Sequence, residues 1–176
     1  AILRGALEIR GTAGGENFSY FRLQVGQGMN PQRWLQLGTD GLSPMTNGLL
    51  AKWDTTGLDG LYAIQLLVVQ ADKSLQRATV LVTIDNTPPV VKIQYPTVAA
   101  EISLDRGRII FQIDASDELG LQSVTLYLDG KLLTEFIQPP YAAGWQVTAG
   151  EHTLRILATD QAGNTTESSV EFSVKP

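Results

Sequence analysis

The sequence contains no cysteine and only one histidine, His152. The absence of cysteine excludes disulfides, thiolate metal sites and cysteine nucleophiles, and a single imidazole cannot form a histidine metal cluster. Basic residues are also scarce, with 13 lysines and arginines against 18 acidic residues and a net charge of −5. Because phosphate groups are bound by basic surfaces, this composition argues against nucleic acids and anionic membranes as partners.

Long apolar runs are missing as well. The longest, Leu61–Val69, is interrupted by Gln65, and a membrane helix needs about 20 consecutive apolar residues. We therefore predict that this chain does not insert into a membrane. The first residues lack a charged n-region and a cleavage site, so we interpret the sequence as a piece of a longer protein.

No constellation of residues points to a reaction. The cluster Gly11-Thr12-Ala13-Gly14-Gly15 is not followed by Lys-Ser/Thr or by a helical pattern. A phosphate-binding loop needs both, so we interpret this cluster as a turn. No motif supplies partners that would place His152 in a catalytic triad. We predict that the chain itself is not an enzyme.

The residues that are present alternate between apolar and polar with a period of two, between turn signals. Clear cases are Phe21–Val25, Ile64–Val68 and Leu154–Ala158. Alternating segments that recur about every 8–12 residues are typical of all-β sandwiches. The sequence therefore predicts an all-β fold.

An internal repeat divides the chain. Shifting the apolar positions of the last hairpin of the first half by 90 residues gives apolar positions in the second half: Ile64, Leu66, Val68, Val80, Val82 and Ile84 become Leu154, Ile156, Ala158, Val170, Phe172 and Val174. Earlier strands match at an offset of 103, for example Phe21 with Val124. We predict two tandem Greek-key immunoglobulin-like sandwiches, residues 1–86 and 87–176. The first carries an extra edge strand in the insertion Asn30–Leu37.

Aromatic residues accompany the repeat. Tyr62 follows Asp59-Gly60-Leu61 and precedes an inward position, which predicts a tyrosine corner whose hydroxyl bonds back to the backbone. His152 takes the same place in the second half. Trp53 and Trp145 recur at similar places, so we expect both to pack in the core or at a corner.

Both halves resemble bacterial immunoglobulin-like or fibronectin-type-III-like modules. The second half carries common motifs of this group: Asp117 and Gly120 before the Val124 strand, Asp129-Gly130, Pro139-Pro140-Tyr141, Trp145, Gly150-x-His152-x-Leu154 and Asp160-x-Ala162-Gly163-Asn164. The motifs of the first half are Ile9-Arg10-Gly11-Thr12-Ala13, Gly26-x-Gly28-x-Asn30-Pro31-x-x-Trp34 and Trp53-Asp54-Thr55-Thr56-Gly57-Leu58-Asp59-Gly60-x-Tyr62, leading to Asp85-Asn86-Thr87-Pro88-Pro89. That string is similar to the C-terminal module of some class A penicillin-binding proteins, which are transglycosylase/transpeptidases.

This resemblance implies a non-catalytic accessory region of an exported bacterial cell-wall protein, acting as a spacer or in binding peptidoglycan or a wall protein. Neither a Ser-x-x-Lys nor a Lys-Thr-Gly motif occurs, so no catalytic residue is carried over. The alternative is an adhesion or carbohydrate-binding module of an unrelated surface protein, because sandwich modules are joined to many parents. Both hypotheses imply a location outside the cytoplasmic membrane.

Oxygen-bearing side chains near the linker are candidate calcium ligands. In a sandwich of this topology the entering chain lies at the same pole as two of the strand-connecting loops. The candidates are Asp85, Asn86, Asp114, Asp117, Glu118, Asp160 and Asn164. Calcium takes about 6–8 oxygen ligands. The alternative is that these residues are present because Asp and Asn hydrogen-bond tight turns, and both interpretations stay open.

Exposed aromatic side chains are the candidates for stacking on a sugar. Trp34 and Tyr20 have no obvious counterpart in the other half of the chain, so the repeat does not assign them to the core. We name both as candidate glycan-binding residues. The alternative for Trp34 is that it shields a sheet edge or packs under its own loop, since scattered surface aromatics are ordinary.

Overall fold

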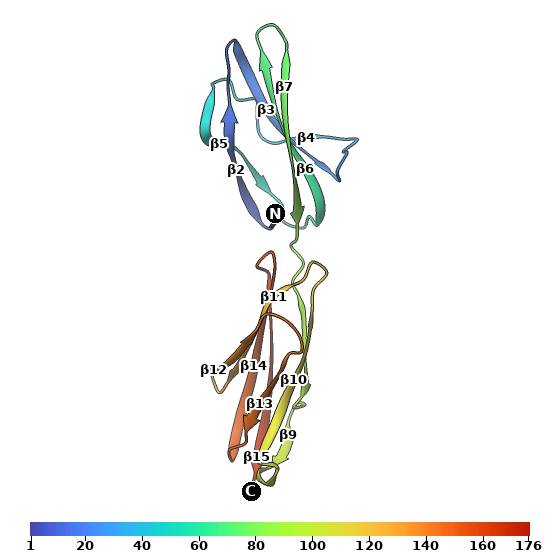
Figure 1. Cartoon of the computed structure of the whole chain (residues 1–176), viewed down its shortest axis with the longest axis vertical. Coiled ribbons are helices and arrows are strands. Elements are labelled where there is room, and N and C mark those ends of the chain that lie inside the picture. Colours follow the sequence, from blue (N-terminus) through green and yellow to red (C-terminus); the bar gives the residue numbers. More distant parts are fainter. The chain divides into compact units, whose positions relative to one another are not determined.

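The computed structural model describes residues 1–176, which divide into two compact units, Ala1–Asn86 and Thr87–Pro176 (Figure 1). Apart from one 3-10 turn, η1 (Leu104–Arg106), the regular structure is entirely strand. No helix has the length and apolar character needed to cross a membrane. The predicted all-β class is therefore confirmed, and each unit is a two-layer sandwich.

The first unit has seven strands in two sheets. Its strands are β1 (Ile2–Leu3), β2 (Ala6–Ala13), β3 (Phe18–Gln27), β4 (Leu35–Gln36), β5 (Met45–Asp54), β6 (Gly60–Gln70) and β7 (Leu75–Ile84). The larger sheet has the order β1-β7-β6-β3-β4, and the smaller pairs β2 with β5. The chain changes sheets four times, between β1 and β2, β2 and β3, β4 and β5, and β5 and β6, as in a Greek key. The two-residue β4 lies at a sheet edge.

The second unit has one more strand than the first. Its strands are β8 (Val90–Tyr95), β9 (Ala100–Ser103), β10 (Arg108–Ser116), β11 (Leu121–Leu128), β12 (Lys131–Phe136), β13 (Ala142–Gln146), β14 (Gly150–Asp160) and β15 (Thr165–Lys175). The sheets have the orders β12-β11-β14-β15-β9 and β13-β10-β8. The sequence did not predict β9, because a short strand in parallel pairing with β15 leaves little alternation to detect.

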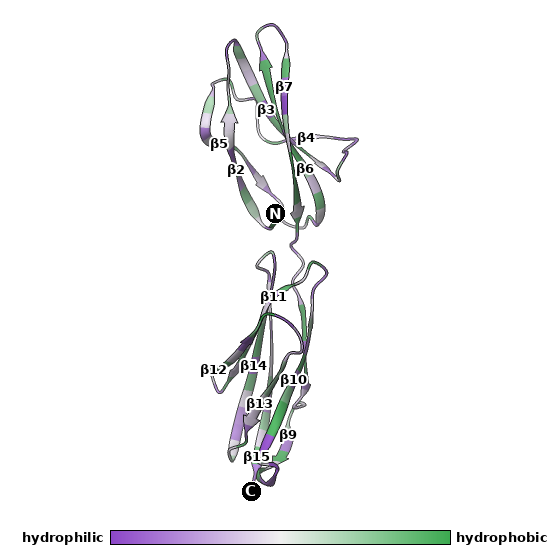
Figure 2. Ribbon diagram, viewed as in Figure 1, coloured by the Kyte–Doolittle hydropathy of each residue, from purple (hydrophilic) through white to green (hydrophobic).

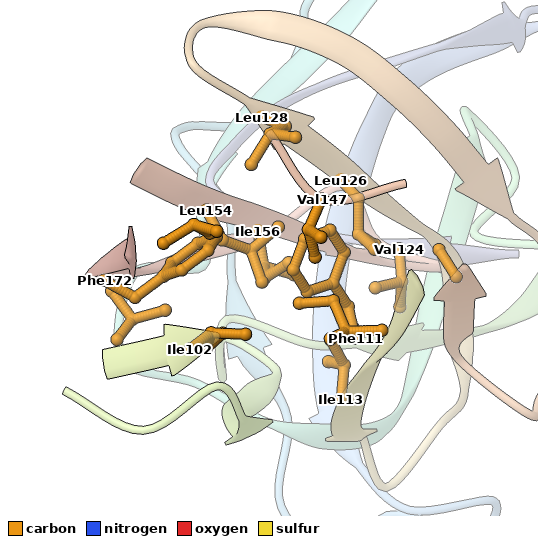
Figure 3. Packing of buried hydrophobic residues seen from close by; sticks show 14 of the residues in the cluster. Ile102, Phe111, Ile113, Val124, Leu126, Leu128, Val147, Leu154, Ile156 and Phe172 are labelled. Atoms are coloured by element: carbon orange, nitrogen blue, oxygen red, sulfur yellow. The ribbon is translucent and has the colours of Figure 1, made fainter. Parts of the chain in front are cut away.

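Each core lies between the two sheets of its own unit. Apolar residues recur along the long strands (Figure 2), and every second one faces inward, as the period of two requires. In the second unit Phe111, Leu126 and Ile156 have no exposed surface and meet between the layers (Figure 3). In the first unit the main cluster includes Leu23, Trp53 and Ile84.

The repeat found in the sequence corresponds to the same hydrogen-bonding register in both units. Ile64 pairs with Val80 in the first hairpin, and Leu154 pairs with Val170 in the second. The offset of 103 holds equally, since Phe21 pairs with Val68 and Val124 with Ala158. A one-residue slip would turn every inward side chain outward. Conserving the apolar pattern between the halves therefore conserves the register.

One position predicted to face the core is exposed. Val80 lies on the inward face of β7 but keeps 56% of its surface, whereas its counterpart Val170 keeps 5%. In the second unit β8, the third strand of the smaller sheet, packs against β15. The smaller sheet of the first unit has only β2 and β5. The middle of β7 is therefore left uncovered on its inner face.

Candidate ligand-binding site

The first unit contains a pocket of about 270 Å³ that is lined by three aromatic residues together with aliphatic and polar ones. It is lined by Val25, Gly26, Gln27, Arg33, Trp34, Leu35, Trp53, Leu58 and Tyr62. These residues come from the end of β3, the loop that follows it, and the corner between β5 and β6. The loop before β4 extends away from the body of the unit in Figure 1.

A glycine allows the loop to fold over the end of β3. A Cβ at Gly26 would lie 2.3 Å from Cβ of Pro31 and 2.8 Å from the Arg33 carbonyl oxygen, so no larger residue fits under this loop. Gly28 has a φ of +85°, a conformation open to glycine at little cost, and its N–H donates to the Leu61 carbonyl. The loop is thereby held against β6 with Trp34 at its end.

The floor of the pocket is an aromatic pair. The rings of Trp53 and Tyr62 meet edge to face with centroids 5.3 Å apart, and the two residues are 4% and 9% exposed. Burial of Trp53 agrees with its predicted packing role. The predicted tyrosine corner is wrong, because the Tyr62 hydroxyl makes no hydrogen bond to the chain. The ring packs on Trp53, while the hydroxyl retains contact with solvent.

Trp34 is half-buried and lines two hollows. The second hollow, about 430 Å³, is also lined by Met29, Asn30, Pro31, Gln32, Gln65 and Thr79. The side-chain amide of Gln65 donates to the Thr79 hydroxyl across β6 and β7. Trp34 therefore separates an aromatic pocket from a shallow surface rich in carboxamides.

Tyr20 is not brought to this pocket. It lies on β3 six residues before Gly26, which corresponds to roughly 20 Å along a strand. The guanidinium of Arg22 lies over the Tyr20 ring at 5.8 Å, and Arg22 forms a bidentate pair with Asp40. The structure thus separates the two aromatic residues named from the sequence, and the role of Tyr20 stays a prediction.

Other pocket residues were not identified from the sequence. Arg33 and Leu58 belong to loops without periodicity, and the repeat assigns Tyr62 to a structural corner. The signals that could have found them are the glycines at positions 26 and 28 and the insertion relative to the second half. Together these indicate a loop packed closely onto a strand end, although they do not indicate which side chains meet there.

His152 has a structural environment in the second unit. Its Nδ1 lies 2.8 Å from Asp129 Oδ2, and its Nε2 lies 2.8 Å from the Thr148 carbonyl oxygen. Burial alone lowers the pKa of His152, but the hydrogen bonds to Asp129 and Thr148 outweigh it and raise the pKa overall. Burial raises the pKa of Asp129, whereas the bonds from His152 and the Thr153 N–H lower it overall. Both ring nitrogens are thus used within the fold.

The predicted calcium ligands of the first unit belong to its final turn. Asn86 receives the Gly5 N–H on its side-chain oxygen and donates its amide to the carbonyls of Thr55 and Leu58. Its own N–H donates to Asp59 Oδ1 at 2.6 Å. Asp85 is buried, and its N–H donates to the Leu3 carbonyl. The hydrogen bonds of Asn86 therefore connect the end of the first unit to its start and to the corner between β5 and β6.

The remaining candidates lie in the second unit. Asp160 is fully buried and accepts hydrogen bonds from the N–H groups of Ala162 and Asn164 and from the Asn164 amide, all at 2.8 Å. A carboxylate oxygen of Asp117 lies within 4.8 Å of one of Asp160.

Asp117 also accepts the Leu119 N–H at 2.9 Å. Asp114 is exposed on β10 and bonds to Gln94, and Glu118, which follows Asp117 in the sequence, is also exposed. Turn stabilisation thus accounts for the hydrogen bonds of Asp160 and Asp117 within this unit. The calcium site, which draws its ligands from both units, stays a prediction.

Parts of this chain are similar to a known family and to solved modules. The family model "Bacterial Ig domain" matches residues 89–156, within the second unit. The solved fibronectin(III)-like modules of CbhA from Clostridium thermocellum cover 99% of this chain, over 87% of that chain, at 19% identity and a TM-score of 0.49. The chain is a pair of immunoglobulin-like sandwiches, and the match to the bacterial Ig family lies in the second of them.

Curated relatives match larger parts of the sequence. A long isoform of ulvan lyase from Alteromonas sp. (strain LOR) is 26% identical over 129 residues, which is 69% of this chain and 12% of that protein. The uncharacterized protein YvnB of Bacillus subtilis (strain 168) is 31% identical over 119 residues, which is 66% of this chain and 8% of that protein. The chain therefore spans about a tenth of the length of these relatives.

Proposed function

We propose that the two modules form a non-catalytic accessory region of an exported bacterial protein, and that the first module binds a glycan. The observation that carries this proposal is the pocket of Trp34, Trp53 and Tyr62. Binding sites for small ligands are concave, largely apolar or aromatic, and carry a few polar groups. A non-catalytic role is supported by His152, whose ring nitrogens already contact Asp129 and Thr148.

The relatives favour a glycan as the ligand. An ulvan lyase is named for action on ulvan, a polysaccharide, and this chain is similar to a minor part of its length. A minor, non-catalytic part of such a protein is suited to holding the enzyme near its polymer. Because the polymer is too large to enter a cell, we place this chain outside the cytoplasmic membrane.

Affinity electrophoresis with polysaccharides cast in native gels tests this proposal. The intact chain is expected to be retarded by at least one glycan, with ulvan and soluble peptidoglycan fragments among those tried. Trp34→Ala should abolish the retardation, whereas Ile137→Ala, at an exposed apolar residue of the second unit, should leave it unchanged. Mobility that no glycan alters would contradict glycan binding.

A penicillin-binding-protein parent is a narrower hypothesis. Its support is the motif string of the first module, from Ile9-Arg10-Gly11 to Tyr62, whereas the relatives described above are ulvan lyase and YvnB. Co-sedimentation with purified peptidoglycan sacculi separates the two parents. Saturable pelleting that exceeds retention on other polysaccharides favours the wall synthase, and the reverse favours a glycan-degrading or adhesive parent.

A further inference from the structure

Two buried aromatic residues of the pocket carry polar groups that make no hydrogen bond within the chain. Tyr62 and Trp53 are 9% and 4% exposed and both line the pocket. Neither the phenol hydroxyl nor the indole N–H bonds to another group of the chain, yet both keep contact with solvent. Buried tyrosine and tryptophan side chains ordinarily find a partner for these groups. A ligand in the pocket would supply the partner.

The second unit places a hydrogen-bonded pair of side chains at the same position. At the offsets of the repeat, Gly26 corresponds to Asp129 and Tyr62 to His152. Asp129 and His152 hydrogen-bond at 2.8 Å, and His152 lies edge to face on Trp145, as Tyr62 does on Trp53. The scaffold is therefore shared. In the second unit Asp129 and His152 hydrogen-bond to each other, whereas in the first unit Gly26 and Tyr62 both line the pocket.

The charge of the pocket comes from one residue. Arg33 is the only charged residue in the lining, is exposed, and forms no ion pair, in contrast to Arg10, Arg22 and Arg155. A planar guanidinium binds carboxylate and sulfate-like groups through paired hydrogen bonds. The pocket is thus locally positive on a chain whose net charge is −5.

The size and walls of the pocket suit one sugar ring. Its volume of about 270 Å³ corresponds to roughly nine water molecules at ~30 Å³ each. A pyranose has an apolar C–H face that packs on an aromatic ring and a rim of hydroxyls that hydrogen-bond. A nucleotide base would also stack, but the phosphates of a nucleic acid would meet an acidic protein.

We propose that this pocket binds an anionic sugar unit, which deepens the proposed glycan-binding function and rests on it. Trp34 stacks on the apolar face of the ring, and Arg33 pairs with its carboxylate or sulfate. The Tyr62 hydroxyl and the Trp53 N–H bond to its ring hydroxyls. The shallow surface lined by Asn30, Gln32 and Gln65 on the other side of Trp34 receives the next unit of the chain.

Calorimetric titration of the intact chain with ulvan oligosaccharides in three forms tests the proposal: native, carboxyl-reduced and desulfated. One of the two modified forms should bind about tenfold more weakly, which identifies the anionic group that Arg33 contacts. Arg33→Gln should weaken binding of the native form to the same extent and remove its dependence on salt. Arg77→Gln, at an exposed arginine on β7 that forms no ion pair, should change neither.

Tyr62→Phe tests the buried hydroxyl without removing its ring. Affinity should fall about three- to tenfold, the effect of one hydrogen bond, while the melting temperature stays unchanged. Tyr127→Phe in the second unit is the matched control and should have no effect on binding.

Three outcomes have distinct meanings. Equal affinity for all three oligosaccharide forms overturns the anionic-sugar assignment and leaves glycan binding intact. Binding that survives both Trp34→Ala and Tyr62→Phe overturns the pocket as the site. Absence of binding to ulvan, to peptidoglycan fragments and to neutral cello-oligosaccharides overturns the proposed function itself.

Discussion

Single side chains determine which contacts each copy of the repeat makes at the equivalent corner. Where the second unit has a hydrogen-bonded Asp–His pair, the first unit has a glycine and a tyrosine that line a pocket, and a neighbouring tryptophan is present in both. The sequence predicts the correspondence of Tyr62 and His152, because the apolar positions around them match without a gap. It does not predict their hydrogen bonds, which depend on whether a carboxylate stands across the sheet.

The His152–Asp129 pair predicts a pH dependence of the second unit. The folded-state pKa of His152 is raised above its ordinary value of 6.5. Its stabilisation is therefore fully present below pH 6.5 and is lost as the pH rises through the folded-state pKa. The pKa of Asp129 is lowered from 3.8, so its contribution is lost only in acid.

Urea unfolding between about pH 5 and pH 9 measures this dependence, followed through Trp145 fluorescence in a Trp34→Phe, Trp53→Phe double variant, in which no other tryptophan remains. The stability of the second unit should decline on the alkaline side, and Asp129→Asn should flatten the profile. An unchanged slope in that variant would assign the dependence to other groups.

Truncation of the Asn86 side chain is expected to lower the stability of the first unit. This side chain holds three backbone groups, the N–H of Gly5 and the carbonyls of Thr55 and Leu58. Asn86→Ala removes the partner of the Gly5 N–H and of the Leu58 carbonyl, whereas the Thr55 carbonyl keeps the Leu58 N–H. The loss costs about 1–3 kcal/mol of unfolding free energy. Denaturant melts compared with Gln76→Ala, at an exposed position on β7, provide the measurement. Equal stability of the two variants would contradict a stabilising role of the Asn86 side-chain hydrogen bonds.

At the scale of elements, the repeat predicts the strands that form the last hairpin of each unit and their register. The repeat cannot predict whether an inward-facing side chain is covered by the opposite sheet, because this depends on how many strands that sheet contains. The pocket shows the same limit. It forms where the end of β3, the loop before β4 and the β5–β6 corner meet. No local sequence pattern indicates that these three segments come together.

The uncovered part of β7 predicts unequal effects of equal substitutions. Val170→Thr buries a hydroxyl at a position that is 5% exposed, which costs about 1–3 kcal/mol. Val80→Thr, at 56% exposed, should change stability by no more than about 0.5 kcal/mol. The two positions pair equivalently within their hairpins, so each variant serves as the control for the other in urea melts. Equal losses would mean that the inner face of β7 is covered in solution.

At the scale of the whole chain, the two units have separate and unequal cores. The cluster in the second unit contains 15 buried apolar residues. The first unit has one cluster of eight and another of three. Because burial of apolar surface is the main stabilising contribution in folding, we expect the second unit to be the more stable. Chains with more than one domain commonly depart from two-state unfolding.

Equilibrium unfolding in guanidinium should therefore show two transitions that different tryptophans report. In Trp145→Phe the remaining fluorescence comes from Trp34 and Trp53 in the first unit, and should follow the transition at lower denaturant. In a Trp34→Phe, Trp53→Phe double variant, Trp145 should follow the later one. Since Trp53 lines the pocket, an anionic glycan that binds there should shift only the first transition, by an amount that grows with ligand concentration. A single transition seen identically by both sets of tryptophans would show that the two cores unfold as one.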